Sequence, residues 1–367
     1  MAPGSKPTGC QNTTAVHERR GMDFISAPMR VKMAPMGEAN PPQAATIHED
    51  PASKVRKAAF DRLKQLKALE IKVIRGEKAG AIHDFRVASR RLEQAFLLLA
   101  PAEAPPPHRR LRRKLARGRK ALSGVRNYDV LLGRASKMLA RKRASRREAW
   151  KAIQDYVRDE RRAKHSKAAE KLAKLNLGRT YSHMRLLLFH PSPGFIHQAA
   201  KKGPTSAKAL FSERLARDLA KVWEEFQKAR DEAQDFSRVP PIHALRIAAK
   251  RLRYLIEIVH LFESPLSGEA LFTLRRLQRT LGDWHDLEMR ERLLSKMAGR
   301  PQFLRSQLSL AGEILKLMAE SRREKARIAS RHPSVLDPDA GERLKCCVQG
   351  LLSGMGGNSH SDWLRRT

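Results

Sequence analysis

The sequence predicts an all-α protein, and three observations favour that class. Apolar residues recur at helical spacing along most of the chain, and no stretch alternates convincingly between apolar and polar residues as a half-buried strand does. Aromatic residues make up only 5% of the 367 residues, whereas charged residues make up 31%. This composition suits helices with modest cores and large charged surfaces better than an aromatic-rich sandwich or barrel.

The first half of the chain divides into an extension and a series of helices. Residues 1–50 are rich in Pro, Gly, Met, Ala and Thr and lack an apolar period, so we expect a disordered N-terminal extension. Ser53 can cap a helix whose apolar positions continue to a stop at Gly76. Further helices are expected over residues 82–99, 108–122, 128–140 and 150–175, and a last one ends at His190.

A linker separates these helices from a second series. Pro and Gly residues break the helical pattern over residues 191–205. Beyond residue 330 the chain carries Pro, Gly and Ser, and we expect a loose tail over 331–367, in which 344–352 could form a short helix. We therefore predict one helical region, 53–330, with halves 53–190 and 206–330. The helices expected in the second half cover 206–233, 241–262, 269–281, 285–297 and 302–330.

The two halves contain a repeated helix. Residues 82–92 align with residues 242–252. Six positions of the first copy have an identical residue in the second: Ile82, His83, Arg86, Ala88, Arg91 and Leu92. Residues 122–130 match residues 281–289 more loosely, at almost the same separation along the chain. Two matches in the same order indicate an internal duplication.

Each copy of the repeated helix places cations on one face and apolar residues on the other. At about 100° per residue, the cations of the first copy fall within a stripe of about 60°. Arg suits phosphate because its planar guanidinium donates two parallel hydrogen bonds. A row of cations on one helix is usually only solvated surface, but two copies favour a ligand site. The stripes consist of His83, Arg86 and Arg90 in the first copy and of His243, Arg246, Lys250 and Arg253 in the second.

The charge balance points to a polyanionic partner. The chain has 74 Lys and Arg against 38 Asp and Glu, a formal net charge of +36. Between Arg109 and Arg147 there are sixteen Lys and Arg residues and one acid, Asp129. Such a block repels itself unless an anion binds nearby. DNA, RNA, an anionic membrane surface and a phosphate polymer all fit this charge.

Other classes of protein are disfavoured. No run of about eighteen apolar residues could span a bilayer, and no apolar stretch resembles a secretory signal. The three cysteines, Cys10, Cys346 and Cys347, have the spacing of neither a zinc site nor a disulfide framework. We expect a protein of the reducing cytoplasm.

The duplicated His-x-x-Arg-[Val/Ile]-Ala-x-[Arg/Lys]-Arg-Leu helix and the later Leu-Gly-x-x-His-Asp-Leu segment resemble the CHAD family, the conserved histidine α-helical domain. The resemblance covers roughly residues 53 to 330. It implies two four-helix bundles related by a pseudo-twofold axis, with a basic surface that binds inorganic polyphosphate, often at polyphosphate granules. The phosphate contacts that it implies are His83, Arg86, Arg90 and Arg91 in the first half, and His243, Arg246, Lys250, Arg251, Arg253 and His285 in the second.

The first half departs from the later motif. Arg126 stands opposite His285, and Asn127 takes the place of an acid, which leaves Arg126 as a candidate contact and weakens any role for Asn127. Asp129 and Asp286 are expected to orient neighbouring arginines, and Trp284 is expected in the core. A supporting basic surface is expected from Arg112, Arg113, Arg119, Lys120, Arg275, Arg276 and Arg279.

Three functions are compatible with these residues. The first is non-catalytic binding of inorganic polyphosphate without a cofactor. If the histidines take part, its affinity should strengthen as the pH falls through about 6.5. The second is sequence-nonspecific nucleic-acid binding, although no stacking aromatics interleave the basic rows. The third is a metal-dependent phosphohydrolase, suggested only by the adjacent His285 and Asp286.

Overall fold

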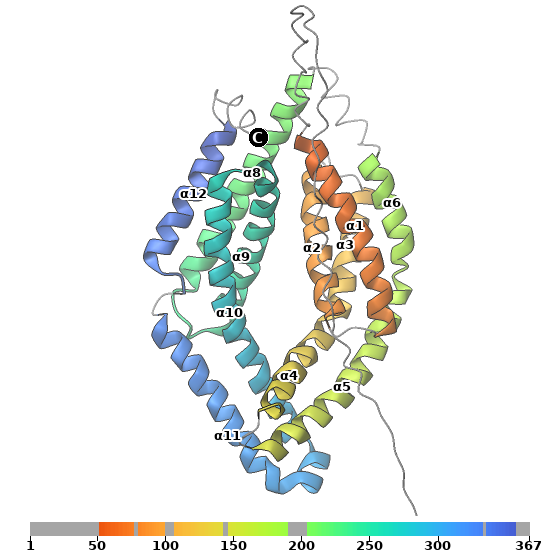
Figure 1. Ribbon diagram of the computed structural model, residues 1–367, viewed down its shortest axis with the longest axis vertical. Coiled ribbons are helices and arrows are strands. Elements are labelled where there is room, and N and C mark those ends of the chain that lie inside the picture. Colours follow the sequence, from red (N-terminus) through yellow and green to blue (C-terminus); the bar gives the residue numbers. More distant parts are fainter. Residues whose placement is uncertain are drawn as a thin grey trace, which may run out of the picture. The chain divides into compact units, whose positions relative to one another are not determined.

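The computed structural model describes residues 51–76, 80–99, 106–141, 146–189, 204–332 and 335–356. The predicted N-terminal extension and residues 191–203 of the predicted linker lie outside these residues. The described residues form helices joined by turns, which confirms the all-α prediction (Figure 1). None of the described helices is long and apolar enough to cross a membrane.

The first half forms six helices. Gly76 follows the first of them with φ +70°, a left-handed conformation that glycine adopts without strain, so the predicted stop is confirmed. The helices are α1 (Pro51–Arg75), α2 (Ala81–Leu99), α3 (Pro106–Ala121), α4 (Ser123–Leu139), α5 (Arg147–Lys174) and α6 (Leu177–Phe189).

In the second half, proline often occupies the first turn of a helix, where its missing N–H costs nothing. Proline lies in the first turn of α8, α9, α10, α11 and α12. The elements are α8 (Pro204–Glu232), α9 (Val239–Val259), the short 3₁₀ helix η1 (His260–Phe262), α10 (Pro265–Ala298), α11 (Pro301–Arg331) and α12 (Pro338–Gly356).

The helices pack in three groups. Helices α1, α2, α3 and α6 contact one another, and α8, α9, α12 and the first part of α10 form a second group (Figure 1). One continuous apolar core runs through both groups and includes Phe85 and Leu92 of α2 and Leu245 and Leu252 of α9. The third group consists of α4, α5, α11 and the second part of α10, around a separate core that contains Trp150.

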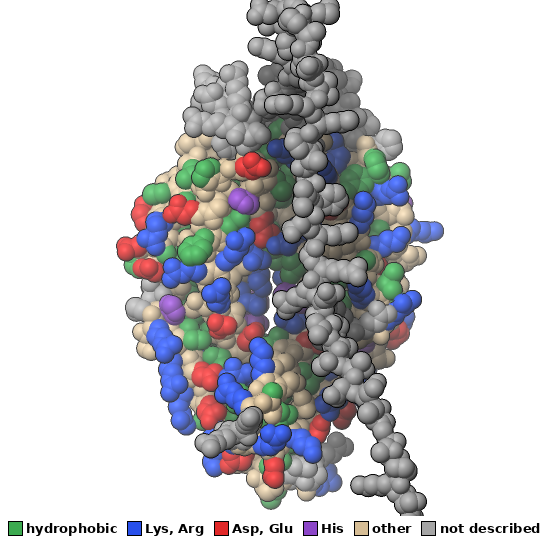
Figure 2. All heavy atoms as spheres, in the orientation of Figure 1, with side chains coloured by type: hydrophobic (Ala, Val, Ile, Leu, Met, Phe, Trp, Pro, Cys, Tyr) green, Lys and Arg blue, Asp and Glu red, His purple; other side chains and the backbone are tan. Residues whose placement is uncertain are grey.

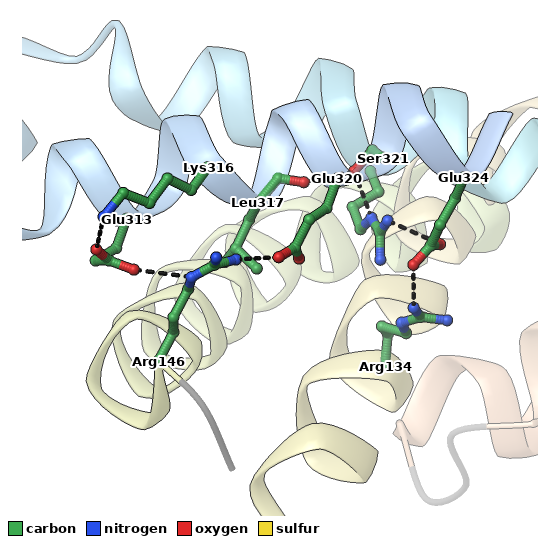
Figure 3. A network of polar contacts seen from close by, with 9 residues as sticks. Arg134, Arg146, Glu313, Lys316, Leu317, Glu320, Ser321 and Glu324 are labelled. Carbon is green, nitrogen blue, oxygen red and sulfur yellow. Dashed lines mark hydrogen bonds and ion pairs between the residues drawn. The ribbon is translucent and has the colours of Figure 1, made fainter. Parts of the chain in front are cut away.

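Ion pairs join α11 to the helices of the first half in the third group. Arg146, immediately before α5, contacts both Glu313 and Glu320 of α11 (Figure 3). Glu324 of α11 accepts hydrogen bonds from Arg134 of α4 and from Arg290 of α10. Since these contacts link the ends of the two halves, the third group fixes how α4 and α10 approach each other.

Two sequence predictions about helix boundaries were wrong. Residues 269–281 and 285–297 belong to one helix, α10, because a single glycine at 282 costs a helix only about 1 kcal/mol. The buried side chains of Leu281 and Trp284 hold the helix on both sides of that glycine, and the prediction that Trp284 lies in the core is confirmed.

The predicted loose tail was wrong over residues 338–343 and 353–356, because the short helix that could form over 344–352 extends over residues 338–356. These residues form α12, which packs against α8 and α10 and buries Leu344, Val348 and Leu351 in the main core. The order of α8 to α12 parallels that of α1 to α6, with the single helix α10 in place of α3 and α4. A duplication would produce this order of helices, but the duplication itself stays a prediction.

A candidate anion-binding pocket between α2 and α9

A pocket of about 750 Å³ lies where α2, α3 and α4 of the first half face α9 and α10 of the second. The two repeated helices, α2 and α9, supply opposite walls. Lys and Arg side chains are numerous and Asp and Glu side chains fewer over the face shown in Figure 2. The cationic groups that line the pocket are Arg86, Arg90, Arg112, Arg119, His243, Arg246, Lys250, Arg251, His285 and Arg292.

Arg86 and Arg90 come from the face of α2 opposite its buried stripe. Phe85 and Leu92 are fully buried on that stripe. Because they face the core, Arg86 and Arg90 on the other side of the helix face the pocket. The Arg86 guanidinium donates a hydrogen bond to the backbone carbonyl of Arg119 on α3. Arg119 in turn donates to the Ser89 hydroxyl over 2.9 Å. The bond to the Arg119 carbonyl holds the Arg86 guanidinium in place without neutralising its charge.

Arg246 and Lys250 occupy the equivalent face of α9. Leu245 and Leu252 are buried on the other side of the helix. The Nε of Arg246 is buried and has no hydrogen-bond partner. A buried donor without a partner costs free energy, which a bound anion would recover.

Four cations of the pocket have no counter-ion in the described part of the chain. No described carboxylate lies within the 4.0 Å limit of an ion pair with Arg86, Arg90, Arg246 or Lys250. Glu93 and Glu288 also line the pocket, but each is paired with other cations: Glu93 with Arg112 and Arg119, and Glu288 with Arg292 and Lys325.

Burial, together with the closeness of the other cations, lowers the pKa values of Lys250, Arg86 and Arg246. Burial, followed by repulsion from Arg246 and Arg90, lowers the pKa of the Lys250 ammonium to about 7. Burial, followed by repulsion from Arg90 and Arg119, lowers the pKa of Arg86 to about 10. Burial also lowers the pKa of Arg246, and Asp286 opposes that shift. The free pocket therefore concentrates positive charge at an energetic cost that an anion can offset.

The histidines feel the same charges. The rings of His243 and His285 lie 5.9 Å apart, and burial together with Arg246 lowers the pKa of His285 to about 4. Partial burial and Arg246 also lower the pKa of His243. Partial burial and Arg126 lower the pKa of His83, which does not line the pocket. In the free protein, protonation of these histidines therefore requires a lower pH than the 6.5 expected from the sequence.

Several predicted contacts lie elsewhere or are paired with acids. Arg91 and Arg253 are outside the pocket lining and both contact Glu257. Arg251 lines the pocket and pairs with Glu225. Arg126 lines a second cavity of about 680 Å³ between α4, α10 and α11. The supporting residues Arg112 and Arg119 line the pocket, whereas Arg113, Lys120, Arg275, Arg276 and Arg279 do not.

The expected contact with an arginine is confirmed for Asp129 and stays a prediction for Asp286. Asp129 forms an ion pair with Arg161 over 2.6 Å, and Asp286 lies near Arg246 and Arg126. In the described residues, no group of three or more His, Cys, Asp or Glu side chains lies close enough together to hold a metal ion.

Sequence reasoning missed Arg292 and discounted Asn127, and both residues line the pocket. Arg292 lines it together with His285, and the seven-residue spacing of the two on one helix could have indicated a shared face. Asn127 lines both the pocket and the second cavity, so the two adjoin. The alignment of Asn127 with Asp286 in the repeat is the sequence signal that could have indicated this position.

The CHAD domain model matches residues 57–295 of the chain, a region that contains every residue described as lining the pocket. The protein belongs to the CHAD family. Its structure is similar to the crystal structure of the CHAD domain from the plant Ricinus communis, with a TM-score of 0.53 and 23% sequence identity. That similarity covers 81% of this chain and 91% of the plant domain, and it shows a shared fold. A comparison with curated proteins finds no match.

Proposed function

We propose that this CHAD protein binds inorganic polyphosphate in the pocket between α2 and α9 and that it does so without catalysis. The observation that carries the proposal is the pairing of two cationic rows, Arg86 and Arg90 against Arg246 and Lys250, none of which forms an ion pair with a described carboxylate. Such rows match the regular charge of a linear phosphate polymer. Family membership supports the same ligand, since some members of the family bind polyphosphate.

The pocket favours a polyanion that has no bases. Its lining contains one Phe, Tyr or Trp residue among the described residues, Tyr254, and that side chain is only 5% exposed. The guanidinium of Arg253 lies 5.1 Å from the centre of the Tyr254 ring and that of Arg91 lies 6.0 Å away. Since binding of single-stranded nucleic acid depends on accessible aromatic faces, this lining favours polyphosphate over RNA or DNA.

The surroundings of His285 favour binding over metal-dependent hydrolysis. Arg246, His243, Lys250 and Arg292 all lower the pKa of His285, so their charges act directly on the imidazole. The same positive charges would repel a divalent cation. We therefore assign His285 to the wall of an anion site.

Calorimetric titration with long-chain polyphosphate tests the proposal. We expect the triple variant R86Q/R90Q/R246Q to bind at least about 100-fold more weakly than the natural chain, because each charged hydrogen bond contributes about 1.5–3 kcal/mol. The matched control is R275Q/R276Q/R279Q, which removes the same charge from α10 outside the pocket. We expect it to bind only a few times more weakly.

Three results would contradict the proposal. An equal loss of affinity in both variants would show that net charge, and not the pocket, binds the polymer. In a competition experiment at equal phosphate concentration, displacement of polyphosphate by single-stranded RNA would instead favour the nucleic-acid function. Release of orthophosphate from polyphosphate in the presence of Mg²⁺ or Mn²⁺ would show catalysis.

A further inference from the structure

The pocket contains one lysine among many arginines. Seven arginines and Lys250 line it as described, together with His243 and His285. An arginine guanidinium stays protonated in proteins and is a poor nucleophile, whereas a lysine amine is nucleophilic once it loses its proton. Lys250 is therefore the group of the lining best suited to form a new covalent bond with an acyl carbon.

The surroundings of Lys250 favour its neutral form. The side chain is partly buried on α9, Arg246, Arg90 and Arg86 lie near it, and no described carboxylate forms an ion pair with it. Burial and the adjacent cations bring its pKa to about 7, so near neutral pH about half of the amine is unprotonated. A lysine placed beside another cation is a recognised arrangement for an activated amine.

The same pocket can hold the two parts of an acylating reagent. Arg86, Arg90 and Arg246 offer donors for a phosphate group. Ile247, which precedes Lys250 by three residues and so lies on the same side of α9, also lines the pocket and is 47% exposed. It provides an apolar surface next to the amine for a short acyl chain.

We propose that Lys250 is a modification site that is acylated by small acyl phosphates, whose phosphate group the pocket arginines bind. The neutral Nζ of Lys250 attacks the acyl carbonyl carbon, and the bond between that carbon and the phosphate oxygen breaks. Inorganic phosphate leaves with the electron pair and takes up the surplus proton of the amine. The products are an amide at Lys250 and free phosphate, so no further reactant is needed.

Acylation would also regulate the pocket. The amide removes one positive charge and places an acyl group between α2 and α9. This consequence rests on the proposed function, because it requires that the pocket bind polyphosphate. The acylation itself does not, and the two can fail separately.

The test is incubation of the full chain with acetyl phosphate at pH 7, followed by mass spectrometry that measures the rate at each lysine. We expect Lys250 to be acetylated at least about tenfold faster than exposed Lys57, because Lys57 lies outside the pocket and lacks the arginines that would bind the phosphate group and favour the neutral amine. Triphosphate should protect Lys250 and leave Lys57 unaffected. The rate at Lys250 should level off above about pH 8.

Two comparisons make the test specific. Lys137 lines the second cavity beside Arg134 and Arg327 but is exposed, so it controls for phosphate anchoring alone. An uncharged acetyl ester controls for nucleophilicity alone. Acetylation of Lys250 no faster than that of Lys57 or Lys137 would overturn the proposal. Equal enhancement with the uncharged ester would overturn the assignment of acyl phosphates.

The regulatory consequence has its own readout. After acetylation, the polyphosphate affinity of the natural chain should fall several-fold. The affinity of the K250R variant, whatever its starting value, should be the same before and after the treatment. If acetylation occurs at Lys250 while affinity is unchanged, the modification site stands and its role in polyphosphate binding is overturned.

Discussion

At the scale of single residues, the carboxylates within reach decide which cations are available to a ligand. Arg90 and Arg91 are neighbours in sequence, yet Arg91 donates two hydrogen bonds to Glu257, at 2.7 and 2.9 Å, while Arg90 faces the pocket. Lys250 and Arg251 differ in the same way, since Arg251 pairs with Glu225. A carboxylate paired with a guanidinium neutralises its charge and so weakens its attraction for an anion.

Lys250 predicts how polyphosphate affinity depends on pH. A bound anion raises the Lys250 pKa from its free value of about 7, so binding takes up a proton at higher pH. The contribution of Lys250 is fully present below pH 7 and is lost as the pH rises from 7 toward the pKa of the bound state. We expect affinity to fall by up to about tenfold per pH unit between pH 7 and 9.

The K250R variant is the control for this pH dependence, because an arginine keeps its charge throughout that range. Calorimetric titrations at several pH values should give a nearly flat affinity for K250R between pH 7 and 9. The histidines act in a separate window, since the His285 pKa is about 4 in the free protein and a bound anion raises it. A natural chain whose affinity is flat above pH 7 would remove Lys250 from the site.

At the scale of elements, the function requires that α2 and α9 stay close although their facing cations repel each other. Glu257 of α9 opposes that repulsion. It binds Arg91 of α2 and lies 3.6 Å from Arg253 on its own helix, and its side chain is only 18% exposed. Glu257 therefore acts as a positioning residue that sets the distance between the two cationic rows.

The E257Q variant tests this role. Although it adds positive charge and releases two arginines, we expect weaker binding of triphosphate, by about fivefold to tenfold, and a loss of about 1–2 kcal/mol in the free energy of unfolding. The matched variant E225Q makes the same charge change and releases Arg251 without touching α2. It should bind as tightly as the natural chain or more tightly, and similar behaviour of the two variants would refute the positioning role.

At the scale of the whole molecule, the net charge of +36 acts on stability and on binding in opposite ways. The excess charge destabilises the free chain through self-repulsion and attracts polyanions. Ion pairs such as those in Figure 3 offset only part of the repulsion, because Lys and Arg outnumber Asp and Glu by 74 to 38.

Salt should therefore raise the Tm of the free chain and weaken its binding of polyphosphate. Between 50 and 500 mM NaCl we expect the Tm to rise, measured by thermal unfolding, because screening relieves self-repulsion. The logarithm of the affinity should fall with the logarithm of the salt concentration with a slope of about −3 if four pocket cations release counter-ions. A Tm that falls with salt would show that ion pairs outweigh repulsion.

The sequence by itself determined the helical class, most helix positions and the two cationic stripes. These properties depend on residues a few positions apart, since apolar periodicity, Gly76 and the proline-initiated helices all act locally. The family motif likewise lies within single helices. The spacing of His, Arg and Lys on α2 and α9 therefore indicated most of the residues that face the pocket, although it also included His83 and Arg253, which do not line it.

Only the tertiary structure decided which of those cations pair with acids and that residues 338–356 pack as a helix against the main core. Arg91 meets Glu257 across 166 positions of sequence, and α12 is held by apolar contacts with α8 and α10 that its own short pattern does not reveal. The low pKa of Lys250 depends first on burial and then on Arg246, Arg90 and Arg86, and the last two of these come from the other half. Contacts between distant segments depend on how helices pack, and no local pattern encodes that packing.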